Sequence, residues 1–182
     1  MPLATGSDLL GIEVSPTAPL FSTLLAVHVT AAFLAVVAGA SAALTRPKGR
    51  GRHSRWGKVY FWAICAVFAT ATALAVMRWA QDRHLFAIGA IAFTAALTGR
   101  LARRLDRPGD GAHILGMGVS YIAMLTAFYV DNGSRLPLWD RLPAVAYWTL
   151  PAAAGTPIIW RALRRHHRTS APTDRPAPAE QP

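Results

Sequence analysis

The sequence contains a run of 25 residues without a formal charge, 20–44, which reads LFSTLLAVHVTAAFLAVVAGASAAL. A helix rises about 1.5 Å per residue, so this run is long enough to cross a hydrocarbon core of roughly 30 Å. A soluble domain of ordinary size has few places to bury a helix that is apolar on all sides. The run therefore predicts a membrane-spanning helix.

Apolar runs of similar kind recur along the chain, separated by short clusters of charge. Hydrophobic residues make up 53% of the sequence and charged residues only 15%. The further predicted spans are 56–77, 84–101, 112–130 and 144–163. The last contains Pro151 and Pro157, which membrane helices tolerate better than soluble helices do. We expect an all-α, polytopic bundle of five transmembrane helices over 20–163, after an extracytoplasmic segment 1–19 and before a disordered cytoplasmic tail 164–182.

Positive charge is distributed unevenly between the two ends of these spans. On one side lie the basic residues that follow the first, third and fifth runs: Arg46, Lys48, Arg50, Arg52, Arg55, Lys58, Arg100, Arg103, Arg104, Arg107, Arg161, Arg164, Arg165, Arg168 and Arg175. The other side has Arg78, Arg83, Arg135 and Arg141. The positive-inside rule then places the N-terminus outside and the C-terminus in the cytoplasm. This asymmetry accounts for the net charge of +10 without a nucleic-acid partner.

Polar side chains inside or beside membrane spans are costly, and they are candidate functional residues for that reason. His28 lies roughly 12 Å below the predicted outer end of its helix. Arg78, His84, Asp131 and Asn132 fall at the outer ends of later spans and predict a polar cluster on that side. An ion pair between Arg78 and Asp131 is the simpler interpretation of this cluster, and a ligand-binding carboxylate is the alternative.

Two histidines fall at matching depth on the predicted cytoplasmic side. His53 directly precedes the second predicted span and His113 lies at the start of the fourth. Histidines on alternate helices of a bundle are the arrangement that bis-histidine ligation of a b-type haem iron requires. Gly57 and Gly116 share helix faces with them and predict room for a macrocycle. Hydrogen bonding or snorkelling at a basic interface is the alternative role for both rings.

A second cofactor on the outer side would need an axial partner for His28. Met124 in the fourth span matches its depth to within a turn, whereas His84 lies too near the surface. Packing is the commoner role of a methionine in a membrane helix.

The order of these features resembles the DUF2306 family of prokaryotic integral membrane proteins, over roughly 28–163. The family pattern His-Arg-x-x-Gly-x-x-Tyr falls on His53, Gly57 and Tyr60 within HSRWGKVY, with Ser54 in place of the arginine. The stretch SYIAMLTAFYVDNG is similar to a subgroup and contributes Tyr121, Asp131, Asn132 and Gly133. The resemblance implies a multi-pass protein of the plasma (inner) membrane of a prokaryote, and it implies no reaction.

A looser architectural similarity is to cytochrome b561-like haem bundles. Three functions remain open from the residues alone. The first is electron transfer through haem b held by His53 and His113, with a quinone or another redox partner. The second is proton-coupled transport through His28, Tyr121 and Asp131, and the third is a non-enzymatic membrane subunit. Catalytic residues and oligomeric state are not defined by the sequence, and membrane lipid is the expected surrounding.

Overall fold

A computed structural model describes residues 18–46, 51–105, 111–137 and 139–170. The regular elements of this part of the chain are α1 (Ala18–Leu44), α2 (Arg52–Met77), α3 (Trp79–Arg104), α4 (Gly111–Asn132), the short 3-10 helix η1 (Gly133–Arg135) and α5 (Ala144–Ser170). The predicted all-α class is confirmed. The chain divides into unit 1, which ends at Phe86, and unit 2, which begins at Ala87 within α3.

Within the described residues, four helices are long and apolar enough to cross a membrane. They are the segments Pro19–Leu44, Arg52–Met77, Trp79–Arg104 and Gly111–Arg135. A chain with several such helices is a multi-pass integral membrane protein. Because apolar helices expose their side chains to lipid, the large exposed residues of α1, such as Phe33 and Leu44, need no protein partner.

The helices extend past the predicted spans, which is a correction to their boundaries. α2 begins at Arg52 rather than at residue 56, and α3 runs from Trp79 to Arg104 rather than over 84–101. α5 continues to Ser170, beyond the predicted limit at 163. Arginine and lysine are good helix formers, and their long side chains reach the hydrated headgroup region. Residues 1–17 and 171–182, which include most of both predicted terminal segments, lie outside the described residues.

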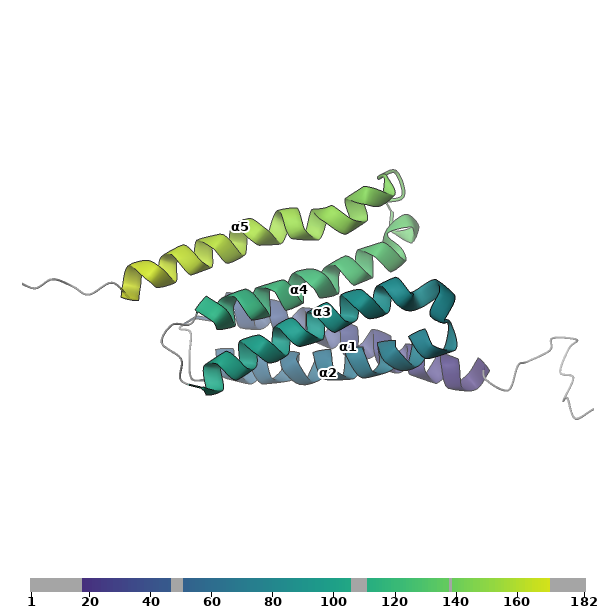
Figure 1. Ribbon diagram of the computed structural model, residues 1–182, viewed down its shortest axis with the longest axis horizontal. Coiled ribbons are helices and arrows are strands. Elements are labelled where there is room, and N and C mark those ends of the chain that lie inside the picture. Colours follow the sequence, from purple (N-terminus) through teal and green to yellow (C-terminus); the bar gives the residue numbers. More distant parts are fainter. Residues whose placement is uncertain (1–17, 47–50, 106–110, 138, 171–182) are drawn as a thin grey trace, which may run out of the picture. The chain divides into compact units, whose positions relative to one another are not determined.

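α5 is not among the helices that are apolar enough to cross a membrane, but it packs along α4. Gly133 of η1 lies opposite Tyr147 of α5, and the opposed pairs along α4 and α5 are Ile122 with Gly155, Gly118 with Ile159, and Gly111 with Leu163. In these pairs the residue numbers rise along α4 while they fall along α5, so the two helices are antiparallel along most of their length (Figure 1). Four of the five predicted spans are therefore matched by candidate spanning helices among the described residues, and the crossing of the membrane by α5 stays a prediction.

Unit 1 contains the hairpin of α1 and α2, which run side by side (Figure 1). Its fully buried side chains include Ala35 and Ala38 on α1 and Tyr60 and Ile64 on α2. Small residues on one membrane helix allow the large residues of its neighbour to pack closely. Tyr60, the last residue of the predicted motif, is thus part of the packed interior.

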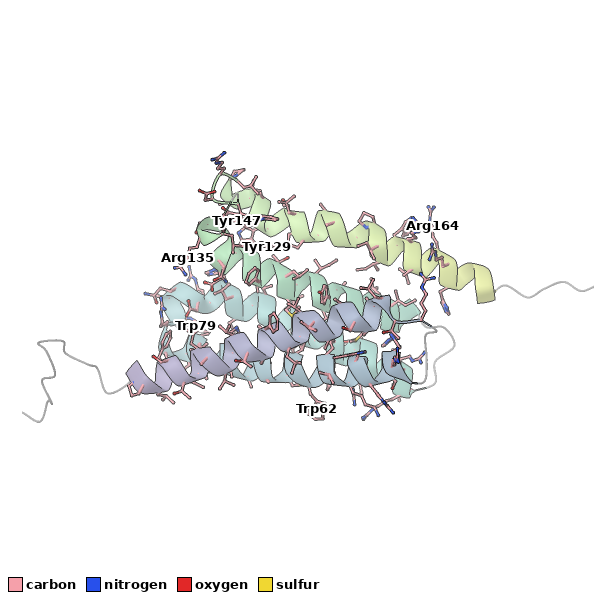
Figure 2. The ribbon with its side chains drawn as sticks, turned by 180° about the vertical axis from the view of Figure 1, so that it is seen from behind. Trp62, Trp79, Tyr129, Arg135, Tyr147 and Arg164 are labelled. Carbon is pink, nitrogen blue, oxygen red and sulfur yellow. The ribbon has the colours of Figure 1, made fainter. Side chains whose placement is uncertain are left out.

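A cluster of aromatic rings packs at the end of unit 2 where the chain passes from α4 to α5. The rings of Tyr129 and Trp139 stack with centroids 4.6 Å apart. The Tyr147 hydroxyl donates a hydrogen bond to the Trp139 carbonyl at 2.8 Å. Figure 2 shows Tyr129 and Tyr147 together at this end of the unit, with Arg164 toward the opposite end of α5. These contacts hold the connection between the two helices.

Candidate functional site

His53 connects the beginning of α2 to the end of α1. Its Nδ1 lies 2.9 Å from the carbonyl oxygen of Ala42. Ala42 is in the last turn of α1, where carbonyls have no partner within the helix. A carbonyl oxygen only accepts, so Nδ1 carries the proton and Nε2 of the neutral ring carries the lone pair.

His113 repeats this arrangement in unit 2. Its Nδ1 donates to the carbonyl oxygen of Gly99 on α3 at 3.0 Å. The approach is possible because Gly99 has no side chain and its backbone touches that of Gly116 on α4. The same tautomer follows, with the basic nitrogen at Nε2. Both histidines therefore lie near the start of a helix and are bonded to the preceding helix, as their sequence positions suggest.

His28, in the middle of α1, is hydrogen-bonded to α2. Its Nδ1 is 2.9 Å from Oγ1 of Thr70. The hydroxyl of Thr70 has one proton, which it donates to the Ala66 carbonyl at 2.7 Å. With the hydroxyl proton on that carbonyl, Thr70 accepts from His28 and Nδ1 is the protonated nitrogen; in the other tautomer the hydroxyl donates to Nδ1. In the first tautomer Nε2 carries the lone pair, the form in which histidine ligates metals.

The two glycines expected to make room for a macrocycle differ. Beside Gly57 no described atom lies within 4 Å of the position that a Cβ would take. Beside Gly116 such a Cβ would lie 2.7 Å from the Ala95 carbonyl oxygen and 2.8 Å from Gly99. The prediction of open space next to Gly116 is therefore wrong, because the α3 backbone already fills it.

At the predicted outer ends, Arg78 and Asp131 each have a polar neighbour close by in the sequence. The Arg78 Nε lies 4.0 Å from an Asp82 oxygen, and its guanidinium lies 5.6 Å from the centre of the Phe21 ring. Asp131 accepts a hydrogen bond of 3.2 Å from the side-chain amide of Asn132. The contact of Arg78 with Asp82 was not predicted from the sequence, although two opposite charges four residues apart are a usable signal for it.

Several predicted associations join a residue of unit 1 to a residue of unit 2, and they stay predictions. They are the pairs of His53 with His113, His28 with Met124 and Arg78 with Asp131. Of the remaining candidates, Met124 is buried and Tyr121 half-buried on α4, whereas His84 is exposed near the start of α3. In the part of the chain that the structure describes, no group of three or more histidine, cysteine or acidic side chains is placed to hold a metal ion.

Sequence reasoning missed the acceptors that orient the histidines. Two of them are backbone carbonyls, which have no sequence signature. The third partner, Thr70, could have been predicted from the sequence. It lies eight residues before Arg78 at the predicted outer end of the second span, and His28 lies eight residues after the predicted outer end of the first span, so the two residues have the same predicted depth.

These features define a multi-pass helical membrane protein with three histidines, each bonded through Nδ1 to an oxygen of an adjacent helix. In comparisons with known proteins, no family model, curated sequence or solved structure matches the chain. The resemblance to DUF2306 accordingly stays a prediction.

Proposed function

We propose that this membrane protein binds a b-type haem and transfers electrons, with His53 and His113 as the axial ligands. The observation that carries the proposal is the shared tautomer of the two rings. Each donates its Nδ1 proton to a helix carbonyl, at 2.9 Å for His53 and 3.0 Å for His113. Such a bond fixes the tautomer and the orientation of the ring, as it does for metal-ligating histidines.

The residues around His53 also suit a bulky ligand. Gly57, one turn further along α2, leaves open space on the same helix face. Arg52 and Arg100 are arginines next to His53 and to the carbonyl that anchors His113, and we expect them to pair with the haem propionates. When bound, haem supplies one-electron chemistry, while the protein supplies ligation, orientation and a medium of low polarity.

In this proposal, His28 belongs to the outer half of the membrane protein. A 2.9 Å hydrogen bond between its Nδ1 and Thr70 on α2 fixes the position of the ring. We assign it, with Arg78, Asp131 and Asn132, to a second haem, a quinone or a proton-transfer step. The proposed location is the inner membrane of a prokaryote, with the C-terminus in the cytoplasm, where a redox partner would meet the basic ends of the helices.

The first test is a reduced-minus-oxidised absorption spectrum of the protein purified in mild detergent after expression with ample haem. We expect a sharp b-type α band. His53→Gln and His113→Gln should each remove it, because the glutamine amide retains a donor for the backbone carbonyl but does not ligate haem iron. His84→Gln, at an exposed position on α3, is the matched control and should retain the band. Full haem in both variants of the inner histidines would contradict the assignment.

A second candidate function is that of a non-enzymatic membrane subunit. The same hydrogen bonds favour it, because each of them joins two neighbouring helices. His28 and His53 join α1 to α2, and His113 joins α3 to α4. Interhelical bonds of this kind stabilise helix pairing in membranes. A featureless spectrum from folded, monodisperse protein would remove the haem proposal in favour of this one.

A further inference from the structure

The C-terminal half of α5 has a shallow cavity with an aromatic wall and a basic lining. Trp160, Arg161, Arg164 and Arg165 line it, and its volume is about 400 Å³. The guanidinium carbon of Arg164 lies 4.6 Å from the centre of the Trp160 ring, within the range of a cation–π contact. That contact restrains Arg164, which Figure 2 shows toward the far end of α5 from Tyr147.

The charge of the cavity selects for an anion. No acidic residue occurs anywhere in the α5 sequence AVAYWTLPAAAGTPIIWRALRRHHRTS. Arg161 and Arg165 are one turn apart, and Arg161 and Arg164 are three residues apart, so the three guanidinium groups lie on neighbouring positions of one helix surface. Arginine binds phosphate through two parallel hydrogen bonds, which lysine does not offer.

The depth of the cavity indicates that the anion belongs to a lipid. Leu163, in the same turn, packs beside Gly111 at the start of α4, which is the predicted cytoplasmic end of the span. Immediately before the arginines, Ile158 is 70% exposed and Trp160 56% exposed. A phospholipid would place its phosphate among the arginines and its acyl chain along these apolar side chains. A free phosphate would use the arginines alone.

We propose that Trp160, Arg161, Arg164 and Arg165 form a binding site for the headgroup of an anionic phospholipid in the cytoplasmic leaflet. The site is independent of haem binding. Anionic lipids are concentrated where membrane proteins carry clusters of arginine and lysine, and each basic side chain near such a surface contributes to the attraction. A specific site differs from this general attraction in two ways: Trp160 contributes to lipid binding, and the guanidinium groups are placed to form paired hydrogen bonds with one phosphate.

The experiment is native mass spectrometry of the full-length protein in a neutral detergent, titrated with phosphatidylglycerol or with phosphatidylcholine of the same acyl chains. We expect phosphatidylglycerol to bind at least about tenfold more tightly, since two or three basic contacts are made. The double variant Arg161→Gln/Arg164→Gln should lose this preference. The matched control Arg103→Gln/Arg104→Gln removes the same charge from the predicted cytoplasmic end of α3 and should keep it. Trp160→Leu should weaken binding several-fold while leaving the charge unchanged.

Three outcomes would overturn the proposal. Equal losses in the two double variants would show general attraction to surface charge. Equal binding of the two lipids by the wild type would exclude a headgroup site. Displacement of phosphatidylglycerol by millimolar inorganic phosphate would identify a free anion as the ligand. Because all three arginines are exposed, the variants should fold, and size-exclusion chromatography verifies this before titration.

Discussion

Replacing Gly116 by alanine would place a methyl group inside the α3 backbone. Its Cβ would lie 2.7 Å from the Ala95 carbonyl oxygen, whereas ordinary van der Waals contact begins at 3.4 Å. The neighbour is backbone rather than a flexible side chain, so α3 and α4 must separate locally by about 0.7 Å. The 3.0 Å bond from His113 to the Gly99 carbonyl would then lengthen beyond hydrogen-bonding distance.

The expected cost combines these effects. Overpacking costs about 1–3 kcal/mol and a lost hydrogen bond about 1 kcal/mol, while alanine in place of glycine within a helix returns up to about 1 kcal/mol. We therefore expect Gly116→Ala to lower the free energy of unfolding by about 1–3 kcal/mol, which corresponds to a Tm lower by roughly 3–10 °C.

The assay is thermal unfolding in detergent, followed by far-ultraviolet circular dichroism, on protein prepared without added haem. Gly57→Ala is the matched control, because its Cβ meets no described atom within 4 Å and it keeps the helix-propensity gain. The control should unfold at the wild-type Tm or slightly above it. A Gly116→Ala protein that is as stable as Gly57→Ala would refute the argument that α3 and α4 touch through their backbones.

Two further predictions concern unit 1 and the topology. Thr70→Val removes the hydroxyl that is hydrogen-bonded to His28 Nδ1 and should destabilise the protein by about 1 kcal/mol in the same assay. Thr72→Val should cost less, because the Thr72 hydroxyl bonds its own helix at Phe68. In a Cys65→Ala background, a membrane-impermeant thiol reagent added to intact cells should label Ser134→Cys but neither Arg104→Cys nor Arg164→Cys. Labelling of Arg164→Cys from outside would show that α5 does not cross.

The number, type and approximate limits of the helices could be predicted because they depend on local properties. A run such as 20–44 is apolar over a length that only a membrane requires, and charge clusters mark the places where the chain leaves it. The errors occurred at helix ends, as at Arg52 and Ser170, where arginine continues a helix into water although it ends an apolar run.

The candidate histidines were also visible in the sequence, because an imidazole within or beside an apolar span is conspicuous. Their hydrogen-bond partners were not, since Ala42 and Gly99 contribute carbonyl oxygens that every residue possesses. The surroundings of Gly116 were likewise not predictable from the sequence. The sequence identifies a small residue, but only the position of α3 decides whether the space beside it is open or filled.

The amino-acid sequence by itself thus determined a multi-pass helical membrane protein, the direction of its charge asymmetry and the histidines that distinguish its helices. These follow from hydrophobic length and charge, which are read along the chain. The tertiary structure alone decided that α5 packs antiparallel along α4, that the α3 backbone fills the space beside Gly116, and that His28, His53 and His113 are each hydrogen-bonded through Nδ1 to a neighbouring helix. The reason is physical: a packing contact or a hydrogen-bond acceptor belongs to two helices at once, and their relative register is set only when they pack.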